Sequence, residues 1–283
     1  MTMWFRGGFG KWFNILMILV ETHSHLNDKA FDADRDAVIA KVFAAGVGKI
    51  VEIACAPGEW AQGERLAAAY RGKFACAFGV HPEYIKDFSP AVMPELESYL
   101  QKPCAVALGE IGLDYWWEAG RKAEQMGLLE SQLPLCAKFG KPAVFHARNG
   151  KTPELRAYGD LLEALKRWDY RPAKKFRGVL HCFSGGWADA RAGLDLGLLL
   201  GVNGTFTYKN NHDLRETVRK AGLANIVLET DCPYLPPQSA RGKRNDPSFI
   251  PEIAAMVATH LGVGNSQVAD QTTANALELF GQF

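Results

Sequence analysis

Short runs of apolar residues recur along this chain roughly every 22 to 36 residues, a spacing that fits one strand and one helix with short connections. Within each run the apolar residues follow one another instead of alternating with polar ones, which is typical of parallel strands buried on both faces. We expect eight such strands, at residues 15–20, 50–54, 74–80, 105–109, 143–145, 179–180, 198–202 and 226–228.

The segments between these runs are long enough for helices and carry apolar residues at helical spacing. Helices are expected at 31–45, 60–70, 94–100, 123–139, 155–168, 187–196, 214–221 and 251–261. Eight alternating units predict one α/β domain, a (β/α)8 barrel of the TIM type, which normally needs about 250 residues. An open doubly wound sheet is the alternative, but it would bind its ligand at one crevice and not gather polar residues from many strands.

Ionisable residues stand at the carboxyl ends of several predicted strands. Five of the seven histidines and two acidic residues do so, namely His23, His25, His81, His146, His181, Glu110 and Asp231. A closed barrel gathers the carboxyl ends of its strands around one mouth. The pattern therefore predicts a single site at that mouth.

The histidines favour a metal at this site. His23 and His25 are separated by one residue, so both side chains lie on the same face of a strand. Taken alone, this pair fits core histidines bonded to backbone carbonyls as well as it fits a metal site. With His146 and His181 at two other strand ends, the metal is favoured, because four neutral imidazoles would otherwise be short of partners.

Glu110 and Asp231 would add anionic ligands to the imidazoles. Six candidate ligands are too many for one tetrahedral ion but suit two divalent ions that share a carboxylate. Glu110, in the middle of the chain order, is the best candidate for the shared ligand. Such mixed ligands accept magnesium, manganese or zinc, so the residues do not fix the identity of the metal.

Composition describes an ordinary globular protein, 48% hydrophobic and 22% charged over 283 residues. The net charge of +1 attracts no polyanion as a whole, so a nucleic acid would have to be held by a local patch. The candidates follow predicted strands, although a solvated surface charge is the commoner role for any one of them: Arg148, Lys151, Lys209, Arg241, Lys243 and Arg244. Six scattered cysteines indicate a reducing compartment, and we expect a cytoplasmic location.

The first 20 residues resemble a crude secretion signal, since Arg6 and Lys11 precede an apolar stretch. We reject that interpretation, because the stretch lacks a small-residue cleavage site, is too short to span a bilayer and continues into the histidine pair. No membrane association is expected. Met17 begins the compact sequence that leads to His23, so residues 1–16 are expected to be an extension or a misassigned start, and 17–283 the barrel.

Six motifs occur in order along the chain: Thr22-His-Ser-His25, Gly79-Val-His-Pro82, Gly109-Glu-Ile-Gly-Leu-Asp114, Phe145-His-Ala-Arg148, His181-Cys-Phe-Ser-Gly185 and Glu229-Thr-Asp-Cys-Pro-Tyr234. Together they resemble the TatD family of metal-dependent deoxyribonucleases, within the amidohydrolase superfamily. The resemblance covers about 17–280. One position departs from the family, because the residue before Thr22 is usually Asp and here is Glu21. This longer side chain could change the support of a neighbouring histidine and so the metal affinity.

The resemblance also implies a division of the ligands between two ions. The implied ligands are His23, His25, Glu110 and Asp231 for one ion, and Glu110, His146 and His181 for the other. His81 is implied as an active-site residue outside the ligand set.

The expected function is that of a divalent-metal-dependent hydrolase, first of all an exonuclease-like deoxyribonuclease with a two-metal mechanism. Its partner would be DNA, as a single strand or an end. We expect Glu110 to bridge the ions, Asp231 to act as the base for water, and His81 to contact a phosphate oxygen or protonate the leaving group. A structural role is the other interpretation of His81. Arg148 and Lys209 are the candidates for phosphate contact.

Tyr115, Trp116 and Trp117 follow the fourth predicted strand, where their rings could stack on the bases of a single strand. A plain packing role for at least one of them is the alternative.

Two other functions stay open. A related amidohydrolase acting on a small amide, lactone or phosphoester could use nearly the same ligands. Many of those enzymes bridge their ions with a modified lysine, whereas Glu110 supplies a carboxylate directly. The remaining alternative is a non-catalytic metal-binding interaction protein. The sequence does not predict an oligomeric state.

Overall fold

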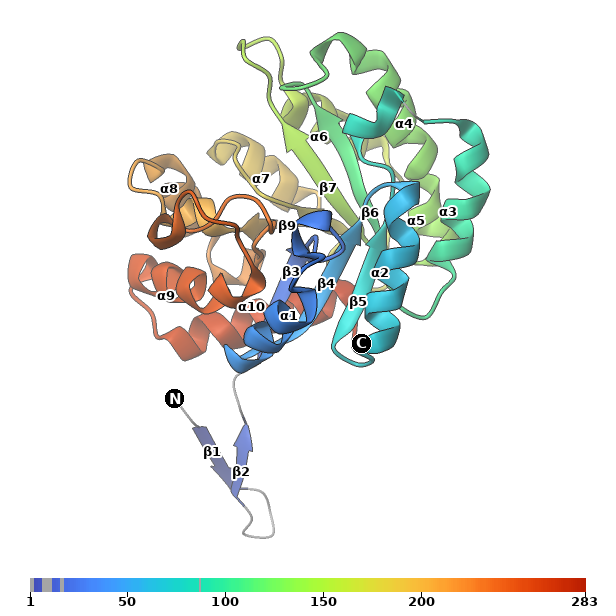
Figure 1. The fold of residues 1–283 in the computed structure, drawn as a ribbon. Coiled ribbons are helices and arrows are strands. Elements are labelled where there is room, and N and C mark those ends of the chain that lie inside the picture. The colour runs from blue at the N-terminus through green and yellow to red at the C-terminus, as the bar shows by residue number, and fades with distance from the viewer. Residues whose placement is uncertain (1–2, 7–11, 16–17, 87) are drawn as a thin grey trace.

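The computed structural model describes residues 3–6, 12–15, 18–86 and 88–283 (Figure 1). Its main feature is an eight-stranded sheet in which strands follow one another in sequence order and neighbouring strands are parallel. The predicted α/β barrel is confirmed. The strands are β3 (Leu19–Ser24), β4 (Val47–Ala54), β5 (Phe74–Phe78), β6 (Ala105–Asp114), β7 (Ala143–Arg148), β8 (Gly178–Leu180), β9 (Leu198–Val202) and β10 (Ile226–Leu228).

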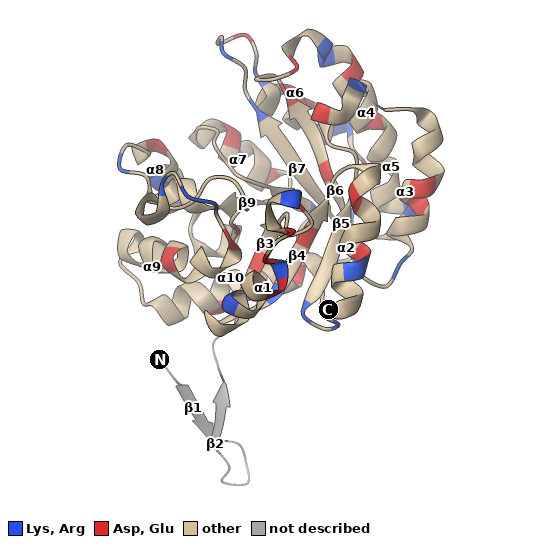
Figure 2. Cartoon of the chain, viewed as in Figure 1, with Lys and Arg blue, Asp and Glu red and all other residues tan. Residues whose placement is uncertain are grey.

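Helices cover the outer face of this sheet (Figure 1). They are α1 (Arg35–Ala44), α2 (Pro57–Ala69), α3 (Met93–Leu100), α4 (Lys122–Gln132), α5 (Pro134–Phe139), α6 (Ala157–Arg167), α7 (Trp187–Asp195), α8 (His212–Ala221), α9 (Ile250–Leu261) and α10 (Asn265–Phe280). Both signs of charge are interspersed over them, in keeping with the small net charge (Figure 2). No helix in the described part of the chain is long and apolar enough to cross a membrane.

The barrel closes where β3 meets the segment that follows β10. Ser24 forms a parallel bridge with Cys232, and the His25 N–H donates to the Cys232 carbonyl at 3.0 Å. The Asp231 N–H donates to the His23 carbonyl at 2.9 Å. The same backbone contacts that close the barrel therefore bring Asp231 beside His23 of β3 and His25 just after it.

The interior of the barrel is apolar below its mouth. Val51, Ala77 and Val144 belong to one buried cluster that draws on the successive strands. Leu279 and Phe280 of α10 belong to the same cluster, so the C-terminal end of this helix packs against the barrel interior. This apolar interior lies beneath the end of the barrel where the metal ligands were predicted.

The first barrel strand lies later in the chain than the apolar run predicts. It spans Leu19–Ser24, and Glu21, Thr22, His23 and Ser24 are all buried in it. The prediction of 15–20 was wrong because the polar site residues are themselves part of the strand. Residue 15 belongs to β2 (Trp12–Ile15), which pairs antiparallel with β1 (Met3–Arg6). Residues 16 and 17 lie outside the described residues, and the boundary at 17 stays a prediction.

Two helical regions also differ from the prediction. The helix expected at 123–139 is divided into α4 and α5, and Pro134 occupies the first turn of α5. Proline has no N–H to donate to the preceding turn, so a new helix starts there. The helix α10 was not predicted.

Gly112 of β6 lets the strand approach β7 beside a predicted ligand. Its φ is +152°, and a Cβ atom there would overlap the carbonyl oxygen of His146. We expect Gly112→Ala to lower the free energy of unfolding by at least about 2 kcal/mol, because both the backbone conformation and the space disfavour a side chain. Urea unfolding would measure this.

Gly127→Ala is the matched control, because a Cβ at this position of α4 would meet nothing within 4 Å. It should raise stability by up to about 1 kcal/mol through helix propensity. Equal stability of the two variants would contradict this account of β6.

Candidate metal centre

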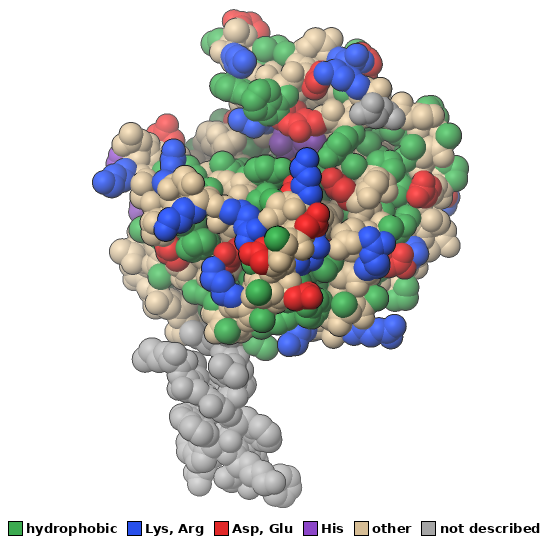
Figure 3. Space-filling view, viewed as in Figure 1, with side chains coloured by type: hydrophobic (Ala, Val, Ile, Leu, Met, Phe, Trp, Pro, Cys, Tyr) green, Lys and Arg blue, Asp and Glu red, His purple; other side chains and the backbone are tan. Residues whose placement is uncertain are grey.

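The predicted site residues meet in a pocket of about 780 Å³ at the mouth of the barrel. Figure 3 shows histidine and acidic side chains at the floor of a hollow in this face of the molecule. His25, His81, Glu110, His146, His181 and Asp231 line the pocket. His23 is fully buried beneath them.

Glu110 of β6 lies at the centre of this group, and its two oxygens face different histidines. Oε1 lies 2.6 Å from Nε2 of His181, 2.7 Å from Nδ1 of His146 and 3.4 Å from Nε2 of His81. Oε2 lies 3.2 Å from Nε2 of His23. One carboxylate thus contacts imidazoles from four different strand ends.

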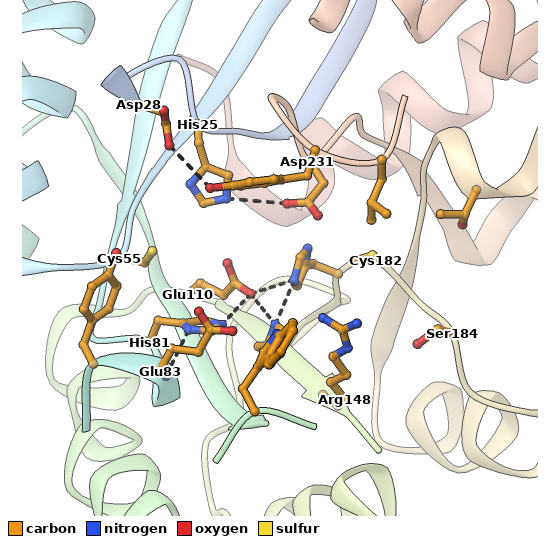
Figure 4. Close-up of a pocket in the computed structure, with 18 of the residues that line it drawn as sticks. His25, Asp28, Cys55, His81, Glu83, Glu110, Arg148, Cys182, Ser184 and Asp231 are labelled. Atoms are coloured by element: carbon orange, nitrogen blue, oxygen red, sulfur yellow. Dashed lines mark hydrogen bonds and ion pairs between the residues drawn. The ribbon is translucent and has the colours of Figure 1, made fainter. Parts of the chain in front are cut away.

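The second carboxylate, Asp231, lies on the β3 side of the cluster. Its Oδ1 is 3.5 Å from Nε2 of His25 and 3.7 Å from Nε2 of His23. Figure 4 shows His25 and Asp231 on one side of Glu110 and His81 on the other. Glu110 therefore lies between two sets of histidines, His23 and His25 on the side of Asp231 and His81, His146 and His181 on the other.

These side chains suit a divalent metal. The donor atoms of His23, His25 and Glu110 all lie within 4.8 Å of one another, and the same holds for His81, Glu110 and His146. Glu110 belongs to both groups. Imidazole and carboxylate are the usual protein ligands of zinc, and carboxylates also suit magnesium and manganese. The residues present fit one or more such ions.

Asp114 accepts a hydrogen bond from one of the candidate ligands, a feature that the sequence did not predict. Its Oδ2 lies 3.0 Å from Nε2 of His146, whose Nδ1 faces Glu110. A carboxylate on the far nitrogen fixes the ring and makes it a better ligand. Because Asp114 and Glu110 are four residues apart in β6, alternation along a strand would have put them on the same face.

Glu21 supports the site through the backbone. One of its oxygens, Oε1, accepts the N–H groups of His23 at 2.8 Å and Thr230 at 3.1 Å, and Oε2 accepts the Thr230 hydroxyl at 2.6 Å. Burial raises the pKa of Glu21 to about 8. The longer acid at this position therefore ties β3 to the segment after β10, where the barrel closes.

A further acidic residue, Glu229, lies beside His181. Its Oε1 is 3.7 Å from Nδ1 of His181, and the Cys182 N–H donates to it. Burial raises the pKa of Glu229 well above its usual range. Glu229 appeared in a sequence motif, but no role was predicted for it.

The pKa values in the cluster follow from burial and the mutual contacts. Burial raises the pKa of Glu110, but the surrounding imidazoles, His181 first among them, outweigh it and hold the pKa well below its usual range. Burial lowers the pKa of His146, but contacts with Asp114 and Glu110 raise it to about 10. The lowered pKa of Glu110 and the raised pKa of His146 both favour a charged Glu110 carboxylate at the centre of the cluster.

The two predicted phosphate contacts lie at different places. Arg148, the last residue of β7, is exposed and lines the pocket. Lys209 is exposed as well, but its neighbour Tyr208 lines the pocket and Lys209 does not. The geometry thus favours Arg148 of the two.

Comparisons with known proteins agree with this fold. A model of the family described as TatD related DNase matches residues 20–281. The chain is 34% identical to the 3'-5' ssDNA/RNA exonuclease TatD of Klebsiella pneumoniae, over 91% of this chain and 95% of the relative. It is 30% identical to YabD of Bacillus subtilis, described as an uncharacterized metal-dependent hydrolase, over 93% and 99% of the two chains.

A solved structure has the same architecture. The crystal structure of YjjV, a TatD homolog from Escherichia coli K12, matches with a TM-score of 0.86 and 30% identity over 94% of this chain and 99% of that one. The family model and these relatives identify the barrel, with its cluster of candidate ligands, as a metal-dependent hydrolase. The chain belongs to the TatD-related DNase family.

The contact between Asp114 and His146 gives a test of the metal site. We expect Asp114→Asn to weaken binding of Mn²⁺ or Zn²⁺ by about 10- to 100-fold, because the amide holds the His146 ring less firmly. Isothermal titration of metal-stripped protein would measure this. Asp195→Asn removes the same charge from an exposed position on α7 and should bind metal as the wild type does. Equal affinities in both variants would contradict the role of Asp114.

Proposed function

We propose that the protein is a nuclease that hydrolyses phosphodiester bonds at the end of single-stranded DNA or RNA with two divalent ions. The observation that carries the proposal is the position of Glu110, whose Oε2 faces His23 while its Oε1 faces His146 and His181. A shared carboxylate of this kind suits a pair of ions, and such pairs are common in phosphodiester hydrolysis. The preference for single strands and the 3' end is taken from the name of the Klebsiella relative.

The ligands would divide around Glu110 as the family resemblance implies. His23, His25 and Asp231 would hold one ion, and His146 and His181 the other, with Glu110 shared. Two bound ions would lower the pKa of a water molecule and offset the charge of the phosphodiester. Magnesium, manganese and zinc all suit these residues.

Asp231 would accept the proton of the attacking water. It lines the pocket, and its Oδ1 lies on the cluster side, 3.5 Å from Nε2 of His25. Burial raises the pKa of Asp231, but the hydrogen bond with His25 and the neighbouring imidazoles outweigh it and lower the pKa below its usual value. Asp231 is therefore a carboxylate at neutral pH and can take up a proton.

His81 would donate a hydrogen bond to the substrate. Its Nδ1 accepts the N–H of Glu83 at 3.2 Å, so the proton of a neutral ring lies on Nε2. That nitrogen points toward Glu110 at the pocket floor. A protonated Nε2 has no lone pair for a metal, which favours His81 as a donor to a phosphate or leaving oxygen rather than as a ligand.

Arg148 would contact a non-bridging phosphate oxygen. It lines the pocket from the end of β7, and none of the ion pairs found among the described residues involves it. A guanidinium can bind two oxygens of one phosphate at once. Lys209 stays a candidate for a phosphate further along the strand, since it lies beside the pocket.

Purified protein should shorten end-labelled single-stranded DNA in the presence of magnesium, manganese or zinc. Glu110→Ala and Asp231→Asn should each reduce the rate by about a hundredfold or more, because the shared ligand or the base is lost. Gel electrophoresis gives the rate, and thermal unfolding shows whether each variant folds. Asp195→Asn is the charge-matched control and should cleave like the wild type.

The proposal fails if no metal supports cleavage of DNA or RNA while amide, lactone or small phosphoester substrates are turned over. If rate and bound metal both survive Glu110→Ala, the shared-ligand assignment is wrong even for an active nuclease.

A further inference from the structure

Large apolar side chains that remain exposed are concentrated near the mouth of the barrel. Among the described residues, five such side chains stand out, namely Ile18, Trp116, Trp117, Tyr234 and Met256. Trp117 is 60% exposed and Tyr234 is 57% exposed, and both line the pocket that contains the metal cluster. Exposed apolar surface beside a site usually contacts a ligand.

These two rings stand on opposite sides of the mouth. Trp117 follows β6 and Tyr234 follows β10, and in the closed barrel three strands separate β6 from β10 in either direction. Glu110 and the histidines lie between them in the same pocket. A substrate whose reacting bond lies over Glu110 would therefore have one ring on each side of that bond.

The segment that carries Trp117 is fixed by hydrogen bonds. Oδ1 of Asp114 accepts the N–H groups of Trp116 and Trp117, both at 2.8 Å, while its Oδ2 contacts His146. The side chain of Gln125 donates to the carbonyls of Asp114 and Glu118, each at 2.9 Å. The backbone that carries the ring is thus tied to Asp114, which holds the candidate ligand His146, and less backbone entropy is lost when a substrate binds.

Tyr234 is held in a similar way on the other side. Its N–H donates to the Asp231 carbonyl at 3.0 Å, and its hydroxyl donates to Oδ2 of Asp28 at 3.4 Å. Its ring lies edge-on to His25, with 6.5 Å between the ring centres. Both rings are therefore anchored to residues of the metal cluster.

Charge differs between the two sides. The guanidinium of Arg148 lies 5.2 Å from the ring centre of Trp116 and 5.6 Å from that of Trp117, and the Lys151 ammonium lies 5.2 Å from that of Trp116. On the other side, Tyr234 lies beside the carboxylate of Asp28. A chain of phosphates is attracted to the tryptophan side, where these cations lie.

We propose that Trp117 and Tyr234 form a stacking clamp for the last two unpaired bases of a nucleic acid. The base of the terminal nucleotide stacks on Tyr234 and the next base stacks on Trp117. The strand then continues past Arg148 and Lys151. Bases within a duplex are covered by their neighbours, so the clamp selects a single-stranded end. This inference rests on the proposed function, which makes the phosphodiester bond between these two nucleotides the one that is hydrolysed.

Equilibrium binding tests the clamp without cleavage. Fluorescence anisotropy would follow a short DNA labelled at its 5' end, in calcium and separately in EDTA. We expect Trp117→Ala to weaken binding about tenfold when all bases are present, and less than about twofold when the penultimate nucleotide is abasic. Tyr234→Ala should likewise weaken binding about tenfold for intact DNA, and less than about twofold for DNA whose 3'-terminal nucleotide is abasic.

The controls separate stacking from folding and from general loss of apolar surface. Trp117→Phe and Tyr234→Phe keep a ring and should bind within about threefold of the wild type. Met256→Ala removes an exposed apolar side chain of α9 that does not line the pocket, and it should have no effect. Thermal unfolding of each variant checks that it folds.

The clamp is overturned if the alanine variants bind like the wild type, or if they weaken binding of intact and abasic DNA equally. Failure of the wild type to bind short single strands in either buffer also overturns it. Base-dependent binding without any cleavage would contradict only the proposed function, and cleavage without base-dependent binding would contradict only the clamp.

Discussion

The rest of the site depends on one buried carboxylate. Glu110 is 3% exposed, and its two oxygens contact imidazoles of His23, His81, His146 and His181, which come from four different strand ends. A buried carboxylate is costly unless positive charge compensates it. Only a closed barrel brings four such strand ends to one point, so the fold and the chemistry are parts of one arrangement.

Much of this could be predicted because the relevant signals are local. The apolar runs predict the barrel, and the ionisable residues at the strand ends predict that they meet around Glu110. The start of β3 could not be predicted from apolarity, since Glu21 and His23 are polar residues buried within it. The contact of Asp114 with His146 and the N–H that sets the tautomer of His81 depend on neighbouring strands and loops, which no single run of sequence specifies.

The same contacts connect the chemistry to the rim of the pocket. Asp114 holds His146 with one oxygen and the backbone of Trp116 and Trp117 with the other. The candidate ligand His146 and one ring of the proposed stacking clamp therefore share one support. On the opposite side, Asp231 faces His25 and its carbonyl accepts the N–H of Tyr234. Substrate recognition and metal binding would then be set by the same short segments after β6 and β10.

The central claim is that Glu110 is a ligand shared by two divalent ions. Electron paramagnetic resonance of the manganese-loaded protein tests this most directly, together with the amount of manganese bound per chain. The account predicts two ions per chain and the spectrum of a coupled pair, because a shared carboxylate keeps two ions a few ångströms apart. One ion per chain, or two ions with the spectrum of isolated manganese, would contradict it.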